Sequence, residues 1–186
     1  MSAVPTPGQT VGPFFGFALP YDGGADLVPP GRADAVRLSG RVLDGHGQPV
    51  PDALVELRQA GPDGAVPTAP GSLHRDGWTF TGWGRAATDR EGHYTFTTLL
   101  PAPVEGGAAF FALAVVARGL TDRLFTRAYV PDDAHALAGD PLLAALPAER
   151  RGTLIARRES GGLRFDVVLQ GEGETVFLAY PRTPRR

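Results

Sequence analysis

Residues 41–60 read RVLDGHGQPVPDALVELRQA, and this stretch decides the fold. Apolar and polar residues alternate before position 44 and again after position 52, which is the period of a half-buried β-strand. Between the two runs, Asp44-Gly45-His46-Gly47 has the composition of a tight turn. The stretch therefore predicts two strands that are joined either as a β-hairpin or as the corner of a sandwich.

A second stretch follows the same plan. Residues 83–98 read WGRAATDREGHYTFTT, in which Asp89 opens a turn and Gly92 takes the position with positive φ. The two stretches are near repeats of each other. They predict a chain built from short strands that are separated by tight Asp-Gly turns.

Further segments add strands to this pattern. Residues 108–117 are almost wholly apolar, as in a strand that is buried on both faces. Residues 124–130 alternate, with Arg127 between two aromatic residues, and alternation returns over 164–170 and 175–179. Because about eight strands are expected, the chain is predicted to be all-β, an antiparallel sandwich or an open barrel.

Two segments depart from the strand pattern. Residues 1–34 carry Pro and Gly at short intervals and have no core pattern of their own, which predicts an extended N-terminal arm that lies on another surface. Asp140 followed by Pro141 is typical of a helix N-terminus, so one short helix is expected over 140–151. The expected organisation is therefore an arm over 1–34 and a β-sandwich over 35–186.

Composition limits the partners and the compartment. The 186 residues carry 18 basic and 20 acidic side chains, and the formal net charge of −2 gives no electrostatic case for binding nucleic acid or an anionic membrane. There is no Cys, so disulfides and thiolate metal sites are excluded. The sequence has no basic leader and no apolar run of membrane-spanning length, and we expect a cytoplasmic protein.

The sequence supplies no self-contained active site. Its four histidines lie in expected turns or loops, and no two have the close spacing of a ligand pair on one strand or helix. Asp132 and Asp133 lie in an expected loop, where solvated acids are usual. The chain lacks a Gly-x-Ser-x-Gly elbow, and Gly171 and Gly173 are not followed by a helix, so neither a hydrolase nor a nucleotide-binding fold is indicated.

Four segments outside the two turns carry a resemblance to a known family. Residues 6–15 read TPGQTVGPFF, 117–120 read ARGL, 153–158 read TLIARR, and 164–177 begin RFD and end QGEGETVF. Together with the two turn stretches, these segments span nearly the whole chain in order. They resemble the intradiol ring-cleaving dioxygenases, and in particular the alpha subunits of heteromeric members. The resemblance implies a prealbumin-like antiparallel β-sandwich.

The resemblance also implies an activity. Heteromeric members open protocatechuate (3,4-dihydroxybenzoate) with O₂ between its two hydroxyls, and their beta subunit holds Fe(III) through two Tyr and two His. At the corresponding positions this sequence has Val66, Val104, Phe110 and Ala112, whose apolar side chains offer no lone pair to a metal. The resemblance therefore implies an alpha subunit without iron, whose partners are an Fe(III)-binding beta subunit, the aromatic substrate and O₂.

A substrate site shared between subunits is implied as well. The resemblance places Thr10, Gly12 and Pro13 of the arm beside the substrate, and Arg118 near the pocket mouth, where a guanidinium can bind the aromatic carboxylate. The residues themselves leave simpler interpretations open, because the arm residues can form an ordinary turn and Arg118 an ordinary interface ion pair. Two other functions also stay open, a transthyretin-like ligand-binding sandwich and a structural β-sandwich module.

Overall fold

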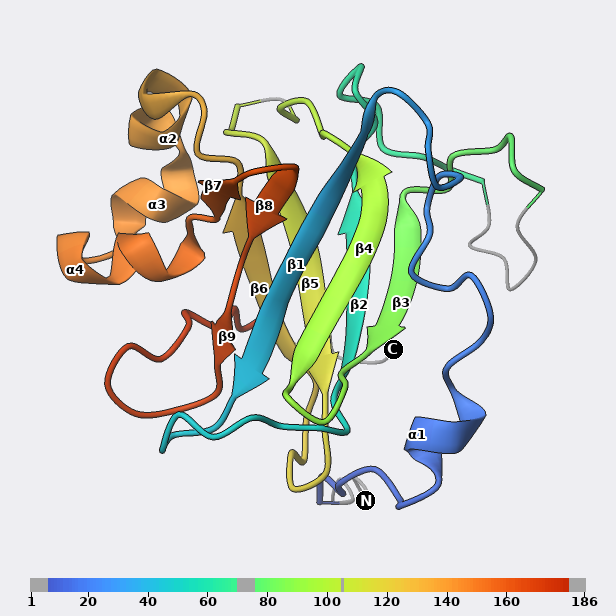
Figure 1. Ribbon diagram of the computed structural model, residues 1–186. Coiled ribbons are helices and arrows are strands. Elements are labelled where there is room, and N and C mark those ends of the chain that lie inside the picture. Colours follow the sequence, from blue (N-terminus) through green and yellow to red (C-terminus); the bar gives the residue numbers. More distant parts are fainter. Residues whose placement is uncertain (1–6, 70–75, 105, 181–186) are drawn as a thin grey trace, which may run out of the picture.

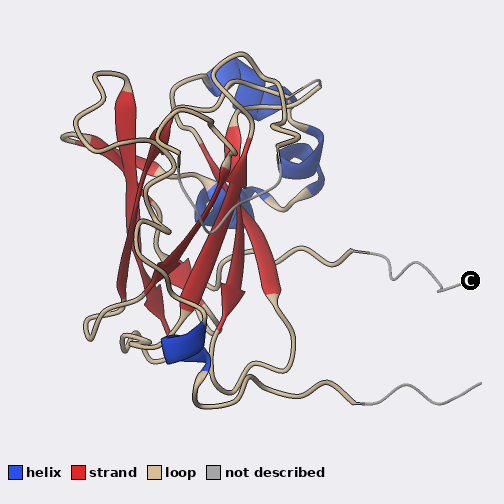
Figure 2. Cartoon of the chain, turned by 90° about the vertical axis from the view of Figure 1, so that its right-hand side faces the viewer, coloured by secondary structure: helices blue, strands red, loops and turns tan. Residues whose placement is uncertain are grey.

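Two sheets pack face to face in residues 7–69, 76–104 and 106–180, the part of the chain that this computed structural model describes (Figure 1). One sheet has the order β4-β1-β8-β7, with β9 also paired to β1, and consists of β1 (Ala35–Leu43), β4 (His93–Leu99), β7 (Arg157–Glu159), β8 (Gly162–Arg164) and β9 (Val167–Val168). The other has the order β3-β2-β5-β6 and consists of β2 (Leu54–Gln59), β3 (Trp83–Ala87), β5 (Phe110–Val116) and β6 (Leu124–Tyr129). Figure 2 shows the two layers from the side.

Neither of the two Asp-Gly turns closes a hairpin. The turn at Asp44 connects β1 to β2, and the turn at Asp89 connects β3 to β4, so each carries the chain from one sheet to the other. β1 then pairs with β4, and β2 pairs with β3, both antiparallel. Of the two arrangements that the sequence left open, the corner of a sandwich is the one observed.

The two turns are nevertheless built alike. In each, Oδ1 of the first Asp accepts hydrogen bonds from the backbone N–H groups two and four residues later, at 2.8–2.9 Å. These backbone hydrogen bonds hold the pKa values of Asp44 and Asp89 below their usual range. Gly47 and Gly92 take φ values of 73° and 75°, which Gly adopts without steric cost. The predicted near repeat is confirmed.

Most strand pairs are antiparallel, as expected, but β1 pairs in parallel with both β8 and β9. β7 was not expected from the sequence. Its three residues, Arg157–Glu159, are all exposed and polar, so they carry no alternation that would mark a strand.

The core fills the space between the inner faces of the sheets. β1 and β4 contribute Leu38, Val42, Tyr94 and Phe96, and β2 and β5 contribute Val55, Leu57, Phe111, Leu113 and Val115. The Tyr94 hydroxyl is one of the polar groups buried there, and it donates a hydrogen bond of 2.5 Å to the backbone oxygen of Phe165. Burial raises the pKa of Tyr94, because the tyrosinate would be desolvated there.

Short helices lie outside the sheets. They are α1 (Phe15–Ala18) in the arm, and α2 (Ala134–Gly139), α3 (Pro141–Ala145) and α4 (Ala148–Arg151) between β6 and β7, across the molecule from α1 (Figure 1). No helix in the described part of the chain is long and apolar enough to cross a membrane.

The segment expected to form one helix over 140–151 forms two, α3 and α4. Asp140 caps α3 as expected, because its side chain accepts hydrogen bonds from the backbone N–H groups of Leu142 and Leu143. Pro147 then interrupts the helix, since proline disfavours helical backbone at the residue before it, and Leu146 is extended.

The N-terminal arm divides into two parts. Residues 24–28 belong to the sandwich: the backbone N–H of Leu27 donates to the oxygen of Thr97 at 2.8 Å, and both Leu27 and Val28 are buried. Part of the segment that the sequence assigned to the arm therefore lies against β4. Residues 7–19 precede this contact and end in α1 (Figure 1).

β5 is fully buried on one face only. Its inward residues are buried, whereas its outward residues, Phe110, Ala112, Ala114 and Val116, are half-buried. The sequence predicted burial of β5 on both faces, and in the isolated chain only the inward face is fully buried. The sandwich has two layers, and β5 lies in the middle of one of them with its second face turned outward.

The close approach of Gly40 to the segment between β8 and β9 gives a test of the packing. A Cβ atom on Gly40 would lie 1.7 Å from the backbone oxygen of Phe165, so we expect Gly40→Ala to lower the free energy of unfolding by about 3 kcal/mol. Gly152→Ala is the matched control, because no atom lies within 4 Å of its Cβ position and its φ is −58°; it should be neutral or stabilise by about 0.5 kcal/mol. Urea unfolding of both variants measures this, and equal effects would contradict the packing.

Candidate functional site

The turn between β5 and β6 holds the arm in place. Thr10 Oγ1 accepts a hydrogen bond of 2.8 Å from the backbone N–H of Gly119, which lies 109 positions later in the chain. Gly8 packs against Thr121 of the same turn, so closely that a Cβ atom would lie 3.1 Å from its backbone oxygen. These contacts bring the arm beside Arg118, although the sequence separates them widely.

Helix α1 closes a pocket against the sandwich. Phe15 is buried and anchors the helix, and its backbone N–H donates to the oxygen of Gly12 at 3.2 Å. A cavity of about 310 Å³ lies between α1 and the segment before β2, and its lining includes Pro13, Asp52 and Arg118. Thr10, Pro13 and Arg118, which the sequence singled out, thus meet at one place, with Gly12 next in the chain.

Arg118 is already paired within the chain. Its Nε donates to Asp52 Oδ2, while 61% of the Arg118 side chain remains exposed. A guanidinium has five N–H donors, and Asp52 is the one carboxylate that the described residues place on it. The ion pair therefore fixes the side chain at the rim of the cavity and leaves most of its donors directed to solvent.

The four apolar positions lie toward the other end of the same sheet. Phe110 and Ala112 belong to the first half of β5, on its outward face. Val66 and Val104 lie in the loops after β2 and β4, which are joined by a backbone hydrogen bond of 3.0 Å between Ala102 and Gly61. Val66 is half exposed and Val104 is half-buried.

A guanidinium lies over this part of the sheet. The Cζ atom of Arg127 is 4.0 Å from the centroid of the Phe110 ring, in the geometry of a cation–π contact. Arg127 Nη1 donates to the Tyr129 hydroxyl at 3.0 Å, and that hydroxyl donates to Asp140 Oδ1 at 2.9 Å. Burial raises the pKa of Tyr129 to about 12, and the hydrogen bond from Arg127 opposes the rise only in part.

The carboxylate of Asp140 connects this cluster to the neighbouring segments by hydrogen bonds. This carboxylate, in a residue that is 1% exposed, accepts from the Tyr129 hydroxyl and from three backbone N–H groups, those of Ala108, Leu142 and Leu143. Burial by itself would raise the pKa of Asp140, but these hydrogen bonds outweigh it and the pKa lies below its usual value. The carboxylate therefore joins α3 to the start of β5 and the end of β6.

These residues do not fit a ferric ion. The side chains at positions 66, 104, 110 and 112 contain only carbon and hydrogen, whereas a metal needs lone pairs. The Tyr129 hydroxyl is committed to Arg127 and Asp140, and the positive charge of Arg127 opposes a cation at the same place.

One group of three potential ligands exists among the described residues, Asp89, Glu91 and His93. Both acids are exposed, Asp89 caps the turn before β4, and His93 Nε2 accepts a hydrogen bond of 2.7 Å from Arg41. The turn before β4 and the pairing of β1 with β4 account for the close approach of these three side chains.

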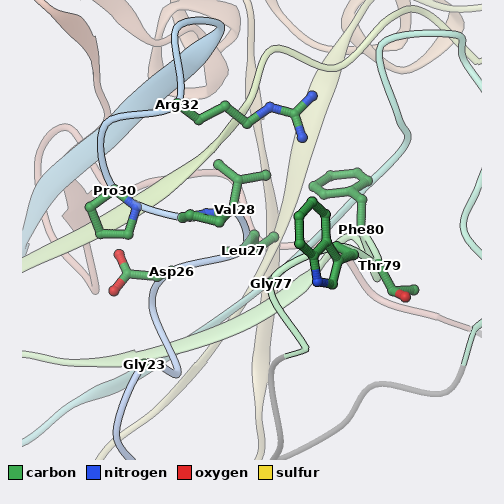
Figure 3. A pocket seen from close by; sticks show the side chains of 11 residues that line it. Gly23, Asp26, Leu27, Val28, Pro30, Arg32, Gly77, Thr79 and Phe80 are labelled. Atoms are coloured by element: carbon green, nitrogen blue, oxygen red, sulfur yellow. The ribbon is translucent and has the colours of Figure 1, made fainter.

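A second, mostly apolar cavity lies where the arm enters the sandwich. It measures about 160 Å³, and Leu27, Val28, Pro30 and Phe80 line it (Figure 3). Arg32 borders it, but Arg32 is paired with Asp34 at 2.5 Å. This cavity contains none of the residues that the sequence singled out.

Sequence reasoning missed Asp52 and the second role of Asp140. Asp52 reads as an ordinary turn residue, and no spacing connects it to Arg118. The alternation over 124–130 did carry a signal for the cluster beside Phe110, because it places Arg127 and Tyr129 on one face of a strand. Only the fold shows that Asp140, at the N-cap of α3, is the acid beside that face.

Comparison with known proteins gives consistent matches. The model of the dioxygenase family matches residues 21–171. The protocatechuate 3,4-dioxygenase alpha chain of Burkholderia cepacia is 37% identical over 191 residues, covering 93% of this chain and 96% of the relative. The beta chain of the enzyme from the same organism is 32% identical over 166 residues, covering 76% of this chain and 67% of the relative.

A solved structure agrees with the fold. The dioxygenase domain of a dioxygenase carbohydrate-binding protein fusion from Streptomyces sp. SirexAA-E superposes with a TM-score of 0.57 and 24% sequence identity. The match covers 90% of this chain and 99% of that one. The all-β sandwich expected from the sequence is confirmed.

The network around Asp140 predicts a pH-dependent stability. Because the pKa of Asp140 is lowered on folding, its contribution is present above pH ~4 and is lost as the pH falls through the folded-state pKa. We expect Asp140→Asn to lower the free energy of unfolding by about 3 kcal/mol at pH 7, and the difference from the wild type to shrink toward pH 2.

The matched control is Asp133→Asn, at the N-cap of α2. Asn caps a helix about as well as Asp, so its effect should stay within about 0.5 kcal/mol. Denaturant unfolding between pH 2 and pH 8 tests both variants. A difference for Asp140→Asn that does not change with pH would contradict the role given to the ionised carboxylate.

Proposed function

The chain belongs to the intradiol dioxygenase family, and on that premise we propose that it is the alpha-type subunit of a heteromeric enzyme that cleaves protocatechuate with O₂. The product would be 3-carboxy-cis,cis-muconate. The observation that carries the proposal is the match to an alpha chain over nearly the full length of both proteins. Family membership also favours this function over the ligand-binding and structural modules that the sequence left open.

Fe(III) is assigned by this proposal to a beta-type partner. The apolar residues Val66, Val104, Phe110 and Ala112 support the assignment, because they cannot supply ligand atoms. The match to a beta chain supports a partner of related fold. In this view the chain contributes no metal ligand and takes part in catalysis by binding and positioning the substrate.

The pocket beside α1 is the part of the chain that we assign to the substrate. Thr10, Gly12 and Pro13 would form a wall of the shared site, and the exposed guanidinium of Arg118 would bind the carboxylate of the substrate. Asp52 supports this role, because it holds Arg118 while leaving donors available for a second carboxylate.

The arm is assigned to the contact between subunits. Phe15 anchors α1 to this chain, while Phe14 and Phe17 are 76% and 87% exposed. Exposed aromatic side chains on one helical turn are suited to a protein contact, because each Phe gains about 2 kcal/mol when it is buried. We therefore assign residues 7–19 to the surface of the partner.

Co-expression tests the proposal directly. The chain expressed alone should bind no stoichiometric Fe(III), show no tyrosinate-to-iron absorption and oxidise no protocatechuate, whereas the complex with the beta-type chain should do all three. Metal analysis, visible spectra and O₂ uptake measure these outcomes. Stoichiometric iron on the isolated chain would overturn the assignment of the metal, and a beta-type chain that is fully active alone would overturn the need for this subunit.

The role of Arg118 has a separate test in the assembled enzyme. We expect Arg118→Ala to raise KM for protocatechuate about 5- to 150-fold, the loss of ~1–3 kcal/mol of a charge-assisted bond, and to leave the iron spectrum unchanged.

Asp52→Ala is the control for that experiment, because it removes the ion pair but keeps the guanidinium. It should raise KM much less than Arg118→Ala. Equal increases in both variants would mean that Arg118 acts only through its pair with Asp52.

A further inference from the structure

The outward face of β5 is apolar and only partly covered in the isolated chain, where Phe110 packs against the cluster of Tyr129, Leu143 and Leu154. Its four outward residues, Phe110, Ala112, Ala114 and Val116, are all half-buried. A strand with one face in solvent normally alternates apolar and polar residues, whereas one that is apolar on both faces is typical of burial on both sides. The sequence of β5 therefore indicates that a second protein surface covers this face.

The charges on the same face are unbalanced. Glu56 on β2 is paired with both Arg85 and Arg123, at 2.6 and 3.6 Å. Arg58 and Arg127 have no direct carboxylate partner among the described residues: Arg58 reaches only the backbone oxygen of Pro67, and Arg127 reaches the Tyr129 hydroxyl and the Phe110 ring. The face is thus positive, although the whole chain has a net charge of −2.

The strand register places Arg58 and Arg127 on either side of one small residue. Arg58 is directly opposite Ala112 in the β2–β5 pair, and Ala112 is directly opposite Arg127 in the β5–β6 pair. Residues opposite each other in neighbouring strands point to the same face, and two strand spacings separate their backbones by about 10 Å. The methyl group of Ala112 leaves the space between the two side chains open.

Covering this face requires negative charge from the other side. An unpaired guanidinium that loses its water costs several kcal/mol, unless a carboxylate replaces the water. We propose that the row formed by Arg58, Ala112 and Arg127 docks the beta-type chain and receives one of its carboxylate side chains between the two guanidiniums. This inference rests on the proposed function, because the partner is the one named there.

A second copy of this chain would not fit the same surface. In a symmetric contact the same patch of both copies meets, so this positively charged face would meet another positively charged face. The acids beside this face are already committed, Glu56 to Arg85 and Arg123, and Asp140 to the Tyr129 hydroxyl and backbone N–H groups. Charge complementarity therefore selects a different chain.

The docking row is continuous with the pocket assigned to the substrate. Leu54 is opposite both Val116 and Ala87 in the same sheet, and Leu54 and Ala87 line the cavity beside Arg118. Ala112 and Val116 are four residues apart on β5, a distance of about 14 Å. One partner surface can therefore cover the docking row and close the pocket together.

The test is the dissociation constant of the complex between the two full-length chains, measured by calorimetry at low salt. Truncation of a charge buried by the partner should weaken binding strongly, so we expect Arg127→Gln to raise Kd about thirtyfold and Arg58→Gln about fivefold. Arg157→Gln is the control, because Arg157 is exposed, lies on the other sheet and is paired with Asp166. It should leave Kd unchanged.

Arg127→Gln also removes the contacts with Phe110 and Tyr129, so the exposed Arg58 provides an independent variant. Arg58→Glu should weaken binding more than Arg58→Gln, and the dependence of Kd on salt should be smaller in the double variant with Gln at both positions than in the wild type. Circular dichroism checks that each variant is folded.

The outcomes separate this inference from the proposed function. If the wild type binds the beta-type chain, but folded Arg58→Glu and the double variant bind it within twofold of wild type, the docking row is wrong and the function stands. If the wild type does not bind the beta-type chain at all, the proposed function fails, and the inference fails with it.

Discussion

The structure depends on one constraint, that each Asp-Gly turn carries the chain from one sheet to the other. Asp44 and Asp89 bind the backbone of their own turns, and Gly47 and Gly92 supply the positive φ that closes them. Because the chain crosses twice between the sheets, β1 pairs with β4 and β2 pairs with β3. The first four strands therefore link the two sheets to each other. The inner faces then have a single place to bury their apolar residues, which is the core.

This fold also places the two groups of candidate functional residues toward opposite ends of one sheet. At one end, the turn after β5 holds the arm and presents Arg118, with Asp52 from the segment before β2 as its partner. Toward the other end, Arg127 stacks on Phe110, one of the four apolar positions that the sequence singled out. Asp140, at the N-cap of α3, stabilises that end by accepting a hydrogen bond from the hydroxyl of Tyr129 on β6.

The local features of the sequence were predictable because they depend on neighbouring residues. The alternation of β1 and β2, the near-repeated turns and the cap at Asp140 all follow from short-range sterics and hydrogen bonding. The burial of Leu27, within the segment that the sequence assigned to the arm, was not predictable, because it depends on a strand, β4, some 70 residues away. β7 was missed for a similar reason, since its exposed residues pair only because β8 lies beside them.

The sequence by itself determined that this is a β protein with two Asp-Gly turns, that positions 66, 104, 110 and 112 carry apolar side chains, and that β5 is apolar on both faces. Composition and spacing are properties of the chain alone, so they need no fold. Only the tertiary structure decided which sheet each strand joins, that Thr10 meets the turn carrying Arg118, and that Arg58 and Arg127 flank Ala112. These are contacts between residues far apart in sequence, and they exist because burial of a shared core brings distant segments to one surface.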